Sequence, residues 1–401
     1  MKHLSFFTVL AALLLFVMPV KAQEEKTEDD KAYQFEIIND IPTTPVKYQY
    51  RAGTCWSYSG LALLETELIR TGKGEYDLAE LFVVRKAYED KADKYVRMHG
   101  KTNFGGGGAF YDVFYIYKHF GMMTEEAYKG LNYGTDNHVH GELDNVLSAF
   151  VDAVIENKNK EVSTAWKRAY ATILDAYLGE VPENFEVNGK TVTPKSFADD
   201  LGLDMDDYIN MTSYTHHPFY EQFALEIQDN WQWAKSWNLP IEEVMQIVDN
   251  AIENGYSVAW GADVSEKGFS WTNGVAIVPE TEKPNLDGLE QAKWETMSSS
   301  EKAKLLYSFD KIVPEKTITQ EMRQEAFDNY TTTDDHGMLL TGKAKDQKGN
   351  IYYKVKNSWD TNNIYDGYFY ASEAFLKYKT MNVVVHKDAI PKAIKKKMGI
   401  K

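Results

Sequence analysis

Cysteine is almost absent from this chain: its 401 residues include a single one, Cys55. One thiol cannot form an intramolecular disulfide, so no covalent cross-link within the chain contributes to its stability. In an exported protein, a disulfide is the usual structural reason for keeping a cysteine. The lack of a partner therefore favours a reactive role for Cys55.

Basic residues are also scarce, with 44 Lys and Arg against 60 Asp and Glu, and the formal net charge is −16. A field of that sign repels phosphate backbones, which argues against a nucleic-acid partner. The glycine run at 105–108 has no strand pattern before it and no GK[ST] after it, so it does not match a phosphate-binding loop. Instead, these glycines allow another backbone to approach closely.

The first 22 residues have the pattern of a secretory signal peptide. An apolar run from Leu4 to Val20 follows a basic start, and Ala22 ends a cleavage pattern of small residues. The apolar run is short for a membrane span, which makes an uncleaved anchor the weaker alternative. We therefore expect an exported protein, periplasmic or secreted, with no stable membrane insertion after cleavage. Residues 23–47 are expected to be a flexible, charged lead-in.

The stretch from Gln49 to Gly72 contains the cysteine and predicts a buried helix directly after it. Apolar side chains recur at helical spacing from Tyr58 to Leu68, and Gly72 is placed to end the helix. A cysteine in the first turn of such a helix lies at the positive end of its dipole, which favours the nucleophilic thiolate. Gln49 precedes it by six residues and offers a side-chain amide beside the sulfur. The alternative is that Cys55 is a small buried hydrophobe.

A histidine and an asparagine lie far downstream, in two consecutive strand patterns. His336 opens the first strand, and Asn357 closes the second, 21 residues later. An antiparallel hairpin places the two side by side, where the asparagine carbonyl holds the imidazole in one tautomer. Trp359 is expected to cover this pair. Cys55 and His336 would then share a proton as thiolate and imidazolium near neutral pH.

The remaining pattern divides the chain into an early helical part and a late strand-rich part. Residues 135–255 are expected to be an inserted, mostly helical region with a hairpin at Phe185–Val192, and short strands follow from Tyr256. His216 and His217 are adjacent in a loop. A metal site there is the alternative to loop packing, and the lack of other spaced ligands favours packing. We expect no metal and no cofactor.

These motifs resemble one known family. The pattern Q-x-x-x-G-x-C-W at Gln49–Trp56, the later His-Gly-Met at His336 and the Asn-Ser-Trp at Asn357 are similar to papain-like cysteine peptidases. Within that family, the likeness is greatest to the bleomycin hydrolase and bacterial aminopeptidase C group. It extends from about residue 48 to about residue 391 and includes the segments 193–214, 258–265, 297–310 and 367–391.

The resemblance implies an α+β fold with two lobes, a papain-like catalytic domain over residues 48–401. It also implies a role for each site residue. Cys55 would be the nucleophile, His336 the general base and acid, and Asn357 the residue that orients His336. Gln49 would form the oxyanion hole with the Cys55 backbone N–H, and Gly107 and Gly108 would pair with the substrate backbone.

The expected function is a cysteine aminopeptidase that removes N-terminal residues from peptides through an acyl-enzyme. The alternatives are a papain-like endopeptidase, a catalytically silent binding protein on this fold, and a thiol amidohydrolase or acyl transferase acting on cell-wall peptides. The group forms homo-hexamers, and its C-terminal tail lies in the active-site cleft. Here the tail, residues 388–401, is short, and the segment associated with hexamer assembly is reduced. We expect Met398–Ile400 to extend into the cleft, with a solvated basic tail as the alternative.

Overall fold

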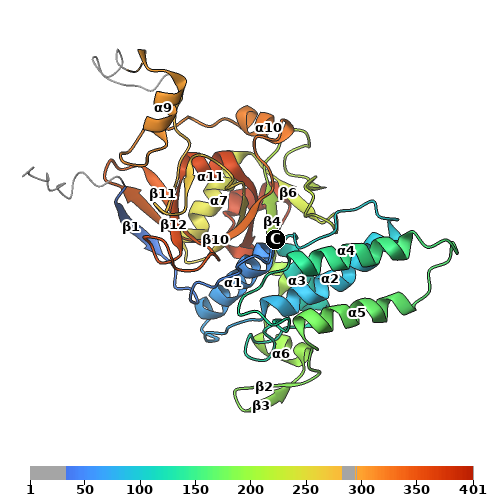
Figure 1. The fold of residues 1–401 in the computed structure, drawn as a ribbon. Helices are drawn as coiled ribbons and strands as arrows, with labels where there is room; N and C mark the ends of the chain where they lie inside the picture. The colour runs from blue at the N-terminus through green and yellow to red at the C-terminus, as the bar shows by residue number, and fades with distance from the viewer. Residues whose placement is uncertain (1–32, 282–293, 295, 401) are drawn as a thin grey trace, which may run out of the picture.

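The computed structural model describes residues 33–281, 294 and 296–400, and it divides them between two lobes (Figure 1). Helices α1 to α6 form one lobe, and a large sheet with its covering helices forms the other. The α+β class that the sequence predicts is confirmed. The predicted signal peptide, residues 1–22, lies outside the described residues.

Helix α1 lies at the centre of the molecule, between the other helices and the sheet. It contacts α2 and α3 on one side and strands β7 and β10 on the other, and every residue from Trp56 to Leu68 is buried. Gly60 lets α3 approach closely, because a Cβ there would lie 2.7 Å from a methyl group of Val113. The helices of this lobe are α1 (Cys55–Arg70), α2 (Glu80–Arg97), α3 (Phe110–Phe120), α4 (Gly141–Ile155), α5 (Ala165–Leu178) and α6 (Pro194–Leu201).

The sheet of the second lobe has eleven strands among the described residues. Its order is β5-β6-β4-β13-β7-β10-β11-β12-β9-β8, and β1 pairs with the far half of β10. A separate hairpin, β2 (Phe185–Val187) and β3 (Lys190–Val192), lies beside α6. The sheet strands are β1 (Phe35–Asp40), β4 (Tyr208–Thr212), β5 (Gln222–Ala224), β6 (Lys235–Asn238), β7 (Val258–Ala262), β8 (Phe269–Ser270), β9 (Val275–Ala276), β10 (His336–Asp346), β11 (Ile351–Lys356), β12 (Tyr368–Ser372) and β13 (Thr380–His386).

Among the described residues, five helices accompany the sheet. Helix α7 packs on β4, β7 and β10, and α11 packs on β11, β12 and β13. In the part of the chain that the structure describes, no helix is both long and apolar enough to cross a membrane. The helices are α7 (Ile241–Glu253), α9 (Ser299–Leu306), α10 (Gln320–Asp328), α11 (Glu373–Lys379) and α12 (Lys392–Met398).

The insertion expected over residues 135–255 is helical in its first half and again at α7 (Ile241–Glu253), but strands lie between these two parts. Helices α4 and α5 pack on α2, and the predicted hairpin is confirmed, with Asn188 and Gly189 at positive φ angles of 51° and 74° in its turn. From Tyr208 onward the chain joins the main sheet, because β4 pairs with β13. The sequence analysis missed strands β4, β5 and β6, because each has five residues or fewer and is too short to show an alternating pattern.

The lead-in expected to be flexible is ordered where the structure describes it. Strand β1 pairs with β10, and the Phe35 ring stacks on Tyr370 with centroids 4.0 Å apart. The packing of Phe35 on Tyr370 and the backbone pairing with β10 therefore hold this segment in place. The prediction for residues 23–47 is wrong for β1, and residues 23–32 lie outside the described part.

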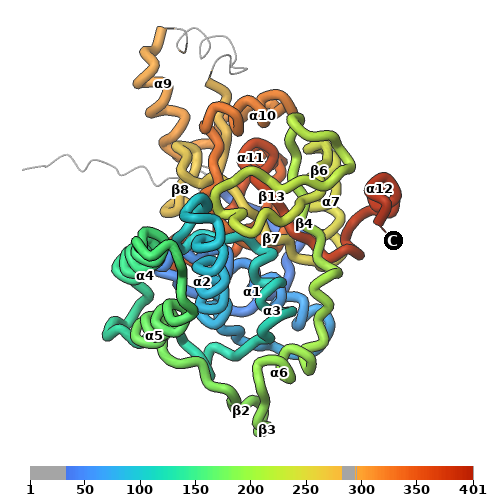
Figure 2. The backbone as a smooth tube through the Cα atoms, turned by 90° about the vertical axis from the view of Figure 1, so that its right-hand side faces the viewer, coloured from blue at the N-terminus to red at the C-terminus, as the bar shows by residue number. Residues whose placement is uncertain are grey.

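The C-terminal tail forms helix α12 and docks beside α7 at the edge of the molecule (Figure 2). Ile394 and Met398 are buried in the same apolar cluster as α7. Gly399 ends the helix in the left-handed conformation, and the Ile400 N–H donates to the carbonyl of Lys395 at 3.0 Å. The expectation that Met398–Ile400 extends into the cleft is wrong, since this apolar contact holds it elsewhere.

Candidate active site

Cys55 is the first residue of α1, where the helix N–H groups have no partner within the helix. The first turn contains no acidic side chain to offset its positive end. The Cys55 Sγ accepts a hydrogen bond from the backbone N–H of Gly337 at 3.3 Å. The sulfur is thus held between the start of α1 and the start of β10.

His336 and Asn357 lie side by side, as the strand patterns predict. The distance from His336 Nε2 to Asn357 Oδ1 is 2.7 Å, and both side chains are buried. Asn357 Oδ1 also accepts the backbone N–H of Ser358 at 2.8 Å, which fixes the amide. An amide oxygen facing Nε2 requires that Nε2 carry the proton, and Nδ1 is then the ring nitrogen that accepts one.

Trp359 covers this pair. Its ring lies 4.5 Å from that of His336, centroid to centroid, with an angle of 30° between the planes. Asp360 follows where the resembled family usually has glycine. The reason for glycine is visible in the backbone: Asp360 has φ of 67°, in the left-handed region. Its carboxylate accepts the Thr361 N–H at 2.7 Å, a local bond that makes Asp tolerable there.

Gln49 is held beside the site by Ser358. The Gln49 N–H donates to the Ser358 carbonyl at 2.9 Å, and the Ser358 hydroxyl donates to Gln49 Oε1 at 2.6 Å. These two bonds orient the amide and leave its NH₂ group as the available donor. The sequence argument identified Gln49 but missed Ser358, although the serine stands between two residues that it did select.

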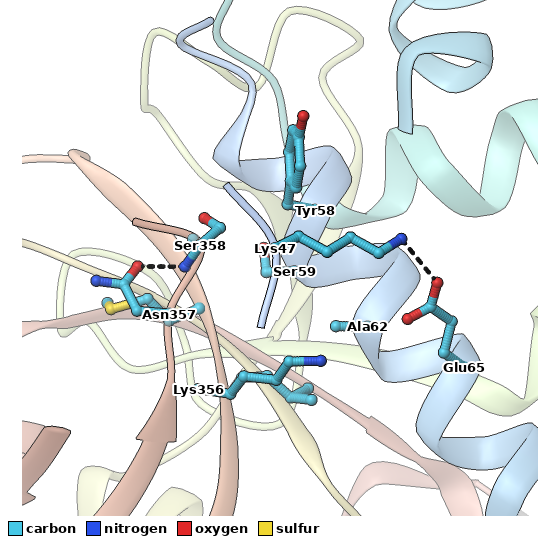
Figure 3. A pocket seen from close by; sticks show the side chains of 11 residues that line it. Lys47, Tyr58, Ser59, Ala62, Glu65, Lys356, Asn357 and Ser358 are labelled. Atoms are coloured by element: carbon cyan, nitrogen blue, oxygen red, sulfur yellow. Dashed lines mark hydrogen bonds and ion pairs between the residues drawn. The ribbon is translucent and has the colours of Figure 1, made fainter. Parts of the chain in front are cut away.

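A pocket behind the site holds a buried charge network (Figure 3). Glu65 on α1 accepts hydrogen bonds from the Thr44 hydroxyl at 2.6 Å, Lys47 Nζ at 3.1 Å and the Leu78 N–H at 2.8 Å. Lys356, the last residue of β11, donates to the same Thr44 hydroxyl at 2.9 Å. The network therefore ties the segment carrying Gln49 to both α1 and β11.

In front of the site, Cys55 and His336 line one small cavity. Among the described residues, none of α12 lines it. Three aspartates line this cavity together with the Cys55 thiol. The lining residues are Cys55, Trp56, Gly108, Ala109, Phe110, Ile227, Asp229, Gly261, Asp334, Asp335, His336, Gly337 and Asn382.

The glycine run forms part of this cavity, but its members differ. Gly108 lines the cavity, whereas Gly107 does not. The Asp229 carboxylate packs against Gly107 so closely that a Cβ would lie 2.2 Å from its oxygens. The buried ammonium of Lys91 donates to the Gly105 carbonyl at 2.9 Å and also to the Gly107 carbonyl. Gly108 is therefore the member of the run best placed for a substrate backbone.

The electrostatics of the site favour neutral groups when the cavity holds no substrate. Burial raises the pKa of the Cys55 thiol to about 12, and Asp334 and Asp229 raise it further, while the Gly337 N–H opposes this. Burial also lowers the pKa of His336 to about 4, against a smaller opposite effect of its bond to Asn357. Burial therefore opposes the thiolate and imidazolium expected near neutral pH, and this ion pair stays a prediction for the site. The sequence does not reveal the depth of burial or the carboxylates beside the thiol.

His216 and His217 also lie close to a carboxylate, outside this cavity. His216 Nε2 is 2.8 Å from one oxygen of Glu226, and His217 Nε2 is 3.1 Å from the other. The three groups place ligand atoms within 4.8 Å of one another. The His216 ring also stacks on Phe327, and the His217 ring stacks on Phe223. Aromatic packing in a loop, which the sequence argument favoured, is present around both histidines.

Comparisons with known proteins agree with this arrangement. The crystal structure of PepW from Lactobacillus rhamnosis superposes with a TM-score of 0.68 at 18% identity, over 92% of this chain and 85% of that one. Aminopeptidase C from Streptococcus thermophilus is 21% identical, over 92% of this chain and 85% of the relative. Aminopeptidase G from Lactobacillus delbrueckii subsp. lactis is 23% identical, over 88% and 83%.

The fold and the family together define a papain-like cysteine peptidase. The model of the Peptidase C1-like family matches residues 82–280 and 292–400, which is more than half of the sequence. The chain belongs to that family.

Proposed function

We propose that the protein is a cysteine aminopeptidase in which Cys55 attacks the first peptide bond of a substrate. The observation that carries this proposal is the cavity shared by Cys55 and His336, together with the 2.7 Å bond from His336 to Asn357. The relatives named aminopeptidase C and aminopeptidase G, which align along most of the chain, support the choice of aminopeptidase.

Each group has a role in the acylation step of this proposed reaction. His336 Nδ1 takes the thiol proton, and Cys55 Sγ forms a bond to the substrate carbonyl carbon. The carbonyl oxygen becomes an oxyanion, which accepts hydrogen bonds from the Cys55 N–H and the Gln49 amide. His336 then donates its proton to the departing amine as the C–N bond breaks, leaving a thioester on Cys55.

Water completes the cycle by reversing these proton transfers. His336 takes a proton from the water as it attacks the thioester, and the sulfur leaves with that proton. Asn357 keeps Nε2 protonated throughout, so that Nδ1 alone exchanges protons. Trp359 lies over the imidazole and limits competition for the bond to Asn357.

The test uses the mature chain and a pair of fluorogenic amides, alanyl-aminomethylcoumarin with a free amine and the same compound with an acetylated amine. An aminopeptidase cleaves the free amine preferentially, and Cys55→Ala abolishes the reaction. Faster cleavage of the acetylated compound, or of blocked peptides inside their chains, would indicate an endopeptidase. Folded protein with no turnover of any peptide would leave the silent binding protein.

Export and assembly are further parts of the proposal. The signal pattern at residues 1–22 supports export to the periplasm or the medium, and N-terminal sequencing of the protein from cell fractions would test cleavage after Ala22. A homo-hexamer is the alternative to a monomer, and sedimentation of the mature protein decides between them.

A further inference from the structure

Two carboxylates reach the active-site cavity from different segments of the chain. Asp334 precedes His336 by two residues, and Asp229 lies in the connection between β5 and β6. Both line the cavity that contains Cys55, and both are mostly covered by protein. Neither was selected from the sequence, because no local pattern marks a loop Asp whose side chain reaches a distant site.

Asp334 differs from the neighbouring acids in having no partner. Among the described residues, its carboxylate has neither a hydrogen bond nor an ion pair. By contrast, Asp335 accepts the Val264 N–H at 3.1 Å, and Asp112 accepts the indole N–H of Trp231 at 2.8 Å. Asp229 has one bond, from the Asn103 side-chain amide at 3.1 Å. Asp334 and Asp229 therefore retain acceptor capacity.

Burial and the closeness of two carboxyl groups oppose the ionisation of Asp334 and Asp229. Burial raises the pKa of Asp334 to about 8, and the charge of Asp229 contributes in the same direction. Burial also raises the pKa of Asp229, while the Lys91 ammonium lowers it. Lys91 is engaged by the carbonyls of Gly105 and Gly107, so its charge does not occupy the cavity. A cation entering the cavity would satisfy both acids at once.

The location of the pair specifies which cation. Asp229 packs on Gly107, the neighbour of Gly108, and Asp334 is two residues before His336. Both acids therefore lie beside the position of the peptide bond to be cleaved. A peptide whose first carbonyl faces Cys55 has its free α-ammonium within one residue of that point. The tail that the resemblance expected in the cleft is docked on α7 instead and does not reach the pair in residues 392–400.

We propose that Asp334 and Asp229 form the subsite that binds the α-ammonium of the substrate, and thereby restrict cleavage to the first residue. This inference rests on the proposed aminopeptidase function. Binding of the ammonium releases the proton held by Asp334 to solvent. The bound positive charge pairs with both carboxylates, so the charge facing the Cys55 sulfur does not become more negative when Asp334 releases its proton.

The experiment compares Asp334→Asn, Asp229→Asn and the wild type on the free and acetylated alanyl amides. The exposed Asp310→Asn, at a distance from the cavity, is the control for the same chemical change. Loss of a charge-assisted contact should lower kcat/KM for the free amine by about 10- to 100-fold, mainly through KM. Cleavage of the acetylated amide should stay unchanged or increase. Asp310→Asn should match the wild type on both compounds.

The outcomes separate this inference from the proposed function. A wild type that prefers the acetylated amide overturns both. A wild type that prefers the free amine, with variants that retain the preference, overturns the ammonium subsite alone. If the variants instead lose cleavage of blocked peptides with lysine before the cleaved residue, the acids bind a side chain and the inference is wrong. A cooperative thermal unfolding transition verifies that each variant is folded, and Asp334→Ser repeats the test with a smaller side chain.

Discussion

The backbone N–H of Gly337 lies 3.3 Å from the sulfur of Cys55 and donates to it. Two elements separated by most of the sequence, α1 and β10, therefore meet at the nucleophile. His336 directly precedes Gly337, so this hydrogen bond also holds the His336 imidazole in a fixed position relative to the Cys55 sulfur. The two lobes are joined at the point where the chemistry occurs.

His336→Ala should lower kcat/KM more than Asn357→Ala does. His336 moves protons in both halves of the reaction, whereas Asn357 only orients it. We expect a loss of at least about 1,000-fold for His336→Ala and about 10- to 100-fold for Asn357→Ala. Steady-state kinetics on the free alanyl amide measures both, and equal losses would contradict a purely orienting role for Asn357.

Ser358→Ala should reduce kcat about tenfold and leave KM nearly constant, because the hydroxyl orients the Gln49 amide for the transition state and not for the substrate. The exposed Ser300→Ala in α9 is the matched control and should have no effect. A rise in KM without a change in kcat would show that Ser358 acts in substrate binding instead.

Alkylation of Cys55 by iodoacetamide should be slow at pH 7 in the free enzyme and accelerate about tenfold per pH unit up to at least pH 9. The reason is that only the thiolate reacts, and the pKa of this thiol is raised to about 12. Asp334→Asn and Asp229→Asn remove negative charge facing the sulfur, lower its pKa and should speed alkylation at pH 9. A rate that reaches a plateau below pH 7 would reveal a thiolate–imidazolium pair in the free enzyme.

Asp334→Asn should stabilise the protein by an amount that grows with pH. The folded-state pKa of Asp334, about 8, exceeds the value of about 3.9 for an unfolded Asp. The unfolded chain therefore releases this proton first, and the wild type loses stability as pH rises from about 4 to 8. The variant lacks that loss, so its Tm should exceed that of the wild type by about 5 °C at pH 8 and by less at pH 5. A constant difference across this range would exclude a raised pKa.

Glu65→Ala should destabilise the fold strongly. The substitution leaves the Thr44 hydroxyl and the Leu78 N–H without their buried acceptor, and it removes one of the three carboxylates that pair with Lys47. We expect a loss of about 3–5 kcal/mol in the free energy of unfolding, measured by urea denaturation. The exposed Glu75→Ala should change it by less than about 0.5 kcal/mol.

The sequence predicted the parts of the site that are encoded in strong local patterns. The helix after Cys55 and the strand that ends before Asn357 both follow from periodicity, and the hairpin between β10 and β11 brings His336 to Asn357. Ser358 and Asp334 could not be found in this way, because their importance comes from groups more than 100 residues away that only the fold brings near. Strand β4 was missed for a similar reason, since its partner β13 lies at the other end of the chain.

Strand β1 sets a limit on how far the protein can be matured from its N-terminus. It pairs with residues 342–346 of β10, the same strand whose first residue is His336, and Phe35 anchors it between aromatic rings. A protease that trims the chain up to residue 32 would leave this ladder intact. A cut beyond Asp40 would expose an edge of β10 and loosen the strand that presents the imidazole, so any N-terminal trimming that preserves the site must end before β1.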